Sequence, residues 1–319
     1  MNYQLVVCIL CMVLFCGCSS GISTSAQSYL AFDTDLPGTA PKVFAKNHLA
    51  PAQEFVGYGR FDPLTGDFYY AITNEKWFPN RLHRISPGKP PELLQLVSDS
   101  WEGEPVFTPD HQLVITAINN SGHSTHWQAD LYRFQRDGGN WVNPTRLPDV
   151  INSPASEWNA SFANNGNFYF SSERKKGTSA LHGDLYVAKP RADGQWLIEE
   201  LPPGINTDYN DSDPLIAPDE SFLIFHSNRP GGVGEHDLYV SFKTKNGWSA
   251  PQNLGRVINT DGWEMAPALT LDGKFLLFTW RAAMETKIPS EIRWVSINVL
   301  KPFKTRASVQ GTEKERNEK

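Results

Sequence analysis

Short apolar runs separated by turn residues recur along the chain, and none has the length or the 3.6-residue period of a helix. Continuous runs such as 222–225 and 275–278 are typical of strands that are buried on both faces. The pairs Asn165-Gly166 and Asp272-Gly273 each lie one residue before an apolar run and favour tight hairpin turns. The pattern predicts an all-β protein built from short antiparallel strands.

One unit is repeated with a period of about 45–55 residues, which is typical of propellers and other repeat arrays. A complete copy has a turn, an apolar run, an Asp-Leu-Tyr such as 130–132, 184–186 or 237–239, and then a Trp. The turn position recurs at Gly66, His111, Gly166, Glu220 and Gly273. Each copy has room for four short strands, so each predicts one four-stranded blade of a β-propeller.

The number of turn motifs favours five blades, with six as the alternative. Residues 41–49 lie where the other copies carry their outer strand, and we expect them to complete the blade begun by residues 264–298. The propeller is therefore predicted over residues 41–303. Residues 304–319 are charged and almost devoid of apolar side chains, so they are predicted to be a disordered tail.

The N-terminus has the features of an export signal. Residues 5–17 are apolar and uncharged but too short for a comfortable transmembrane helix. All the cysteines fall in this region: Cys8, Cys11, Cys16 and Cys18. Gly17-Cys18 resembles a bacterial lipoprotein signal, which implies cleavage after residue 17 and acylation of Cys18. An ordinary signal cut near Ala26 is the alternative.

The resemblance to lipoprotein signals implies an exported protein anchored to the bacterial outer membrane. Ser19 after the lipidated cysteine, with no Asp there, resembles lipoproteins sorted to that membrane, on either its periplasmic or its surface side. Residues 18–40 are rich in Ser, Thr, Gly and Ala and are predicted to be a tether. A mature chain whose only cysteine is acylated has no intrachain disulfide.

Two segments make the repeat more specific. Residues 227–232 followed by 237–239, and residues 266–275, resemble the WD40-like β-propeller repeats of bacterial envelope proteins, the TolB-like type. The resemblance covers residues 100–280 well and 41–100 loosely. It is specific for the fold and carries little information about function.

Composition excludes several functions. The chain has 319 residues, 29 basic and 35 acidic, and a net charge of -6, so no basic field points to nucleic acid. The Gly-x-Ser-x-Gly elbow, the phosphate loop and the dinucleotide fingerprint are all missing from the sequence. No cofactor is expected.

The strand order of a blade places the loop between the second and third strands on the same face as the loop between blades, here called the upper face. An acidic series begins the inner strands and is predicted to ring the channel mouth there: Glu54, Glu104, Glu157, Asp213 and Glu264. Such a ring binds a cation, a basic partner or a sugar, or it serves only as a structural brace. Arg174, Arg229 and Arg281 are its expected ion-pair partners.

Histidines are also predicted in the upper loops, namely His123, His126, His182 and His236. A His-x-x-His pair without a third ligand is weak evidence for metal, so no metal site is predicted. Asn152, Asn206 and Asn259 are expected to close turns onto nearby backbone. Trp141, Trp196 and Trp248 are expected to pack between blades.

These features favour a monomeric, lipid-anchored module that binds or scaffolds an envelope protein or a glycan. The alternative is a propeller hydrolase that acts on a carbohydrate or on a small ester or lactone, because glycoside cleavage needs paired carboxylates. The recurrence of the acids at one place in every blade counts against catalysis, since a catalytic pair needs two distinct environments.

Overall fold

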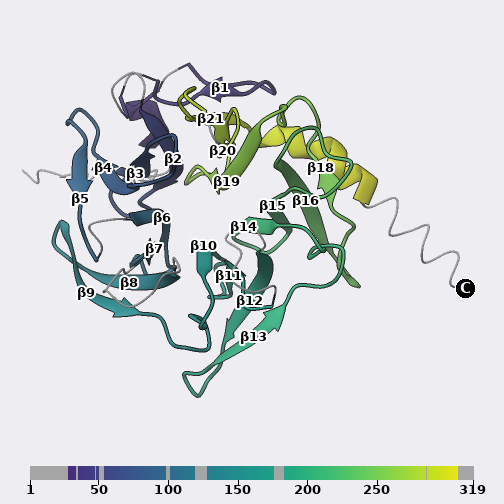
Figure 1. Ribbon diagram of the computed structural model, residues 1–319, viewed down its shortest axis with the longest axis horizontal. Coiled ribbons are helices and arrows are strands. Elements are labelled where there is room, and N and C mark those ends of the chain that lie inside the picture. Colours follow the sequence, from purple (N-terminus) through teal and green to yellow (C-terminus); the bar gives the residue numbers. More distant parts are fainter. Residues whose placement is uncertain are drawn as a thin grey trace, which may run out of the picture.

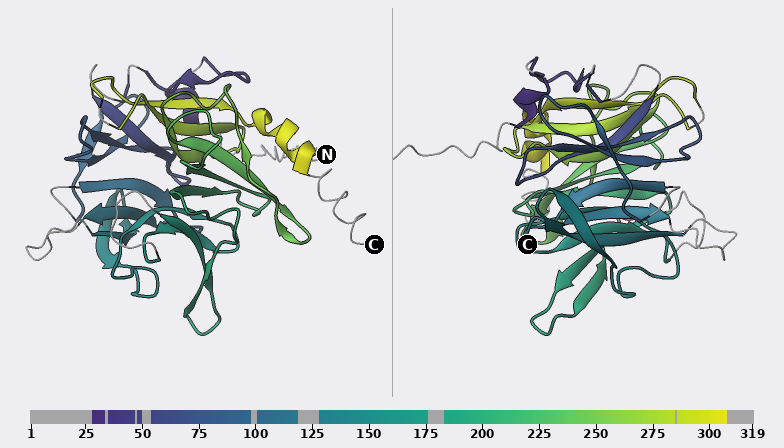
Figure 2. Two further views of the ribbon diagram at one scale, coloured as in Figure 1. Left: turned by 45° about the vertical axis from the view of Figure 1, so that its right-hand side comes forward. Right: turned by 90° about the vertical axis from the view of Figure 1, so that its left-hand side faces the viewer.

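The computed structural model describes residues 28–33, 35–46, 48–49, 54–97, 101–118, 128–175, 183–284 and 286–307. Five antiparallel sheets are arranged around a central axis, and the strands run between the two faces of the molecule (Figures 1 and 2). Each sheet is one blade. The five-blade prediction is confirmed, and the six-blade alternative is not what the described chain forms.

Blades 1 to 3 are each one continuous segment of chain. Blade 1 consists of β2 (Phe55–Phe61), β3 (Phe68–Thr73), β4 (Arg81–Ile85) and β5 (Glu92–Leu94). Blade 2 consists of β6 (Trp101–Phe107), β7 (Leu113–Ile118), β8 (Ala129–Asp137) and β9 (Asn140–Arg146). Blade 3 consists of β10 (Glu157–Phe162), β11 (Phe168–Ser172), β12 (Asp184–Pro190) and β13 (Trp196–Glu200).

Blades 4 and 5 depart from this plan in their outer strands. Blade 4 consists of β14 (Asp211–Ile216), β15 (Phe222–Ser227), β16 (Asp237–Thr244) and two short outer strands, β17 (Gly247–Trp248) and β18 (Gln252–Asn253). Blade 5 consists of β19 (Trp263–Leu269), β20 (Phe275–Arg281), β21 (Glu291–Ser296) and β1 (Lys42–Val43). Lys42 pairs with Trp294, so the N-terminal strand completes the last blade as the sequence predicted.

Apolar side chains fill each of the five seams between adjacent blades. The seam between blades 5 and 1 buries Phe44, Phe68 and Trp294, and that between blades 4 and 5 buries Leu238, Leu276 and Phe278. Equivalent clusters join blades 2 and 3, 3 and 4, and 1 and 2. The core is therefore a ring of five interfaces, which explains why the second strands are apolar on both faces.

The predicted boundaries need correction at both ends of the propeller. The predicted tether includes η1 (Ser28–Ala31), and Tyr29 and Phe32 are buried in the seam between blades 5 and 1. The predicted tail was placed from residue 304, but η2 (Ile297–Leu300) continues into a helical turn over 301–307. Ala307 is buried against blades 4 and 5, and Gln252 of β18 donates to the Phe303 carbonyl oxygen. Figure 1 shows this helical turn beside β18. None of the helices in the described ranges is long and apolar enough to cross a membrane.

Candidate functional site

Each inner strand contains a β-bulge near its middle, and the bulge directs one side chain into the central channel. The five bulge residues all have positive φ: Tyr58, Glu104, Asn159, Asp213 and Ala266. The bulge interrupts the alternation of side chains, so the bulge residue and the residue before it both face the channel. Earlier in the strand the alternation holds, so the side chain three residues before the bulge also faces the channel and the one two residues before it points away. The bulge thus sets which residues line the channel.

The bulge N–H groups link neighbouring blades. Asn159 N–H donates to Glu104 Oε2 at 2.6 Å, and Ala266 N–H donates to Asp213 Oδ2 at 2.9 Å. Hydroxyl oxygens do the same elsewhere, with Thr279 accepting from Tyr58 N–H and Ser171 accepting from Asp213 N–H. The carboxylates of Glu104 and Asp213 therefore have a structural role as well as a place in the channel.

The predicted acidic ring is wrong as a single series, because its members occupy three different registers. Glu104 and Asp213 are bulge residues, whereas Glu157 and Glu264 lie two positions before a bulge and point away from the channel. Glu54 precedes β2, is exposed, and lines a separate hollow beside Arg81 and His83. A bulge inserts a residue without a clear sequence signal. The sequence alone therefore does not show which of these acids faces the channel and which points away from it.

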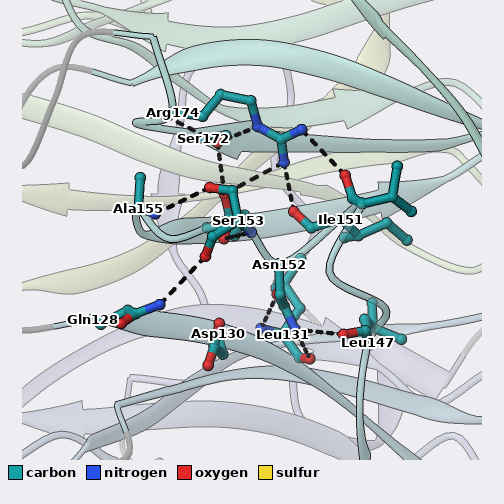
Figure 3. Close-up of polar contacts among 12 residues, drawn as sticks. Gln128, Asp130, Leu131, Leu147, Ile151, Asn152, Ser153, Ala155, Ser172 and Arg174 are labelled. Carbon is teal, nitrogen blue, oxygen red and sulfur yellow. Dashed lines mark hydrogen bonds and ion pairs between the residues drawn. The ribbon is translucent and has the colours of Figure 1, made fainter.

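The acids two positions before a bulge hold the preceding loop. Glu157 accepts from the Ser153 and Ser172 hydroxyls and from Arg174 at 3.4 Å. Figure 3 shows that Arg174 also donates to the Ile151 carbonyl oxygen. Asp211 and Arg229 repeat this arrangement at 2.6 Å in blade 4. Glu264 accepts from Thr260.

The arginines expected to pair with the acidic series, and the asparagines before the inner strands, make contacts that hold the fold together. Arg281 pairs with no acid in the described chain; its guanidinium lies over Phe55 and Trp77 and donates to carbonyl oxygens. Asn152 accepts from Leu131 N–H and donates to the Leu131 carbonyl oxygen (Figure 3). Asn206 and Asn259 repeat these bonds with residues 21 positions earlier. Asn152 and Asn206 also donate to carbonyl oxygens five residues earlier, which confirms for these two the prediction that they close turns onto nearby backbone.

A pocket of about 450 Å³ opens at the upper end of the channel. Its walls carry four indoles and a phenol: Trp77, Trp101, Trp158, Trp263 and Tyr58. Polar groups between them include Glu104, Glu173, Asp213, His226 and Asn210. Trp101, Trp158 and Trp263 occupy the channel-facing positions one or three residues before a bulge. These tryptophans were not identified as channel-facing from the sequence, because their distance from the bulge decides this and the position of the bulge is known only from the structure.

Glu104 and Asp213 lie in different electrostatic environments. Burial, and then the charge of Asp213, raise the pKa of Glu104 to about 8. Burial alone would also raise the pKa of Asp213, but His226 and the Ala266 N–H hold it below its usual value. Arg60, two residues after Tyr58, adds a buried positive charge that acts on both carboxyls. Near neutral pH, Glu104 thus holds a proton while Asp213 is ionised.

Two of the described histidines, His226 and His236, are buried beside the pocket. His226 Nδ1 is 3.1 Å from Asp213 Oδ2, and its ring packs edge-to-face on His236. His236 is only 5% exposed, packs 4.0 Å from the Trp263 ring centroid, and has its pKa lowered to about 3 by burial. It is therefore a packing residue next to the upper loops.

The remaining predicted histidines, His123, His126 and His182, lie outside the described residues. Within the described residues, no group of three or more His, Cys, Asp or Glu side chains is placed to hold a metal ion.

No family model matches the chain, and no curated protein matches it. Solved structures with similar folds include TolB from Acinetobacter baumannii (17% identity, TM-score 0.43, covering 73% of this chain and 50% of that one). Another is an α-L-arabinofuranosidase from Lactobacillus brevis (9% identity, TM-score 0.49, covering 77% of this chain and 92% of that one). A third is a protein of unknown function from Dyadobacter fermentans (11% identity, TM-score 0.49, covering 81% of this chain and 97% of that one). Similarities this low assign neither a family nor an activity, and function must be argued from the pocket.

Proposed function

We propose that the central pocket binds a carbohydrate. The observation that carries this proposal is the set of four indoles and one phenol surrounding buried carboxyl groups in a pocket of about 450 Å³. The C–H faces of a sugar ring pack against indole rings, and its hydroxyl groups donate to carboxyl oxygens, which makes strong hydrogen bonds. Pockets with apolar walls and a few placed polar groups are typical ligand sites.

Trp77 is the most suitable side chain for testing carbohydrate binding. It lies on the loop between β3 and β4, and the Arg281 guanidinium lies 4.1 Å from its ring centroid. Trp77→Ala is expected to weaken the binding of a responsive oligosaccharide more than about tenfold, measured by calorimetry against a panel of glycans. Trp248→Ala, on the outer strand β17, is the matched control and should bind normally. Equal affinities of the two folded variants would contradict the proposal.

Hydrolysis of the bound carbohydrate is the second candidate, and the divergent environments of Glu104 and Asp213 favour it. A protonated Glu104 is suited to donate a proton to a leaving group, and an ionised Asp213 is suited to act as base or nucleophile. The acids do not recur in every blade at this position, so the objection from repetition does not apply. Glu104→Gln should abolish release of reducing ends while leaving oligosaccharide binding within a fewfold; cleavage by this variant would exclude the mechanism.

We further propose that the propeller is held at the bacterial outer membrane through acylated Cys18, a residue outside the described ranges. Gly17-Cys18 after an uncharged apolar run supports this. Cys18→Ser should move the protein from the membrane fraction to the soluble fraction and remove labelling by a fatty-acid analogue. Labelling of the variant would contradict the proposal.

A further inference from the structure

Glu173 is a buried acid in the pocket wall, and no cationic side chain among the described residues pairs with it. It directly follows β11, its N–H donates to the Ser156 carbonyl oxygen at 3.0 Å, and it is only 3% exposed. Oε1 accepts from Trp158 Nε1–H at 3.0 Å, and Glu173 forms no ion pair among the described residues. Arg174 is directed to Glu157 instead. A carboxyl buried without a counter-charge is costly, so its presence needs a reason.

The fold itself does not require a charge at this position. Blade 4 has Asn228 at the equivalent place, after Ser227 and before Arg229, and its Oδ1 accepts from Asn210 N–H at 2.8 Å. A neutral amide thus serves the scaffold there. Burial raises the pKa of Glu173 to about 7, and the nearby Glu157 charge adds to this, so the surrounding protein stabilises its ionised form poorly.

Two perpendicular indoles stand beside this carboxyl. Trp158 bonds Glu173 directly, and the Trp101 ring lies edge-to-face with Trp158 at a centroid distance of 5.4 Å and an interplanar angle of 83°. All three side chains line the pocket. Indole faces attract cations through their quadrupole, and the effect is strongest where water is excluded.

We propose that Glu173, Trp101 and Trp158 form an ammonium-binding subsite, so that the carbohydrate taken by the pocket carries a free amino group. This inference rests on the proposed carbohydrate function. The carboxylate accepts hydrogen bonds from a primary ammonium while the indoles contact its charge and the adjacent C–H groups. An N-acetylated sugar would instead place a neutral amide against Glu173 and lose the charge pair.

The test compares two oligosaccharides that differ only in this group. Calorimetry at pH 7 would measure binding of a β-1,4-glucosamine tetramer and of its fully N-acetylated counterpart. The free amine is expected to bind at least about tenfold more tightly. Glu173→Gln, which keeps the acceptor for Trp158, should reduce the affinity for the amine to that of the acetylated sugar. Glu199→Gln, on outer strand β13, is the control and should retain the preference.

The outcomes separate this inference from the proposed function. Equal binding of both tetramers, or a preference that persists in Glu173→Gln, would overturn the ammonium subsite and leave carbohydrate binding intact. Failure of every glycan in the panel to bind would contradict both. Thermal melting of each variant is the folding control.

Discussion

At the residue scale, Glu104 and Asp213 combine a structural bond with a place in the pocket wall. One oxygen of each carboxyl accepts the bulge N–H of the adjacent blade, at Asn159 and Ala266. The same oxygens accept from Thr116 and His226, so both groups are oriented from two sides. Orientation of this kind is what a binding or catalytic carboxyl needs, because a loosely held group has no fixed direction in the pocket.

Glu104 should make the stability of the propeller decrease as pH rises. Its pKa is raised to about 8 in the fold, from an ordinary value of 4.5. Below pH 4.5 Glu104 holds its proton in both the folded and the unfolded chain. Above pH 4.5 the unfolded chain releases this proton first, so the contribution of Glu104 to the free energy of unfolding falls until the pH passes the pKa of the folded state. Glu104→Gln should therefore show a smaller decrease in unfolding free energy between pH 5 and 8, by up to a few kcal/mol.

Chemical denaturation at several pH values would measure this difference. Glu173 and Glu264 also have raised pKa values, but they titrate in both proteins and cancel in the comparison. Glu199→Gln provides the control for loss of an exposed charge. Parallel pH profiles for the wild type and Glu104→Gln would show that Glu104 is ionised in the fold.

The sequence could identify these acids but not their different roles. Glu104 and Glu157 look alike in the repeat, yet one is a bulge residue and the other stands two positions before a bulge. Alternation then places the first in the channel and the second against its own loop. Glu173 was not identified as a binding residue from the sequence. Its counterpart in blade 4 is Asn228, so no acid recurs at this position of the repeat.

At the element scale, an acid two positions before the bulge fixes the loop that precedes β10, β14 and β19. In blade 4, Asp211 accepts from the Thr207 N–H and hydroxyl, from Ser227 and from Arg229, at 2.6–2.7 Å. The Arg229 guanidinium also donates to the carbonyl oxygens of 204 and 205. Together these contacts form a polar brace that joins loop, inner strand and second strand, so it sets the register at the pocket rim.

Asp211→Ala should therefore be strongly destabilising. The acid is fully buried, and its loss leaves Arg229 and two hydroxyls without their acceptor; breaking such a pair costs about 3–5 kcal/mol. Glu199→Ala removes an acid from the exposed pair with Lys189 and should cost less than about 1 kcal/mol. Urea denaturation would compare them, and similar small losses would show that the brace contributes little.

The turns of the propeller were predicted well from the sequence. The packing of its N-terminal and C-terminal segments against the blades was not. All five predicted turn residues have positive φ, as the glycines among them suggested. Residues 18–40 are rich in Ser, Thr, Gly and Ala, which predicts a tether, yet Tyr29 and Phe32 within this stretch are buried in the seam between blades 5 and 1. A few apolar side chains among many polar ones give no periodic signal, and the same holds for Phe303 and Ala307 in the C-terminal turn.

At the scale of the whole molecule, the pocket exists only because the ring is closed. Its tryptophans come from blades 1, 2, 3 and 5, and blade 4 supplies Asp213 and His226. Such convergence of distant segments cannot be read from local sequence. The closing seam is built on Phe44, whose N–H donates to the Ile292 carbonyl oxygen and whose ring contacts Phe68 and Trp294 at centroid distances of 5.0 and 5.2 Å.

Phe44→Ala should consequently weaken the entire propeller. Loss of a fully buried Phe costs about 3–5 kcal/mol. Because every blade contacts two neighbours around a closed ring, amides of β11 and β15, far from the seam, should exchange faster in proportion to the global loss, as should those of β20 and β21. Hydrogen exchange followed by mass spectrometry measures both sets. Leu197→Ala, at an exposed position of β13, is the control and should leave all of them protected. Faster exchange confined to β1, β2 and β21 would instead show that the seam opens locally while the other blades stay folded. Closure of the ring at this seam would then act on the pocket rim without controlling the stability of the whole propeller.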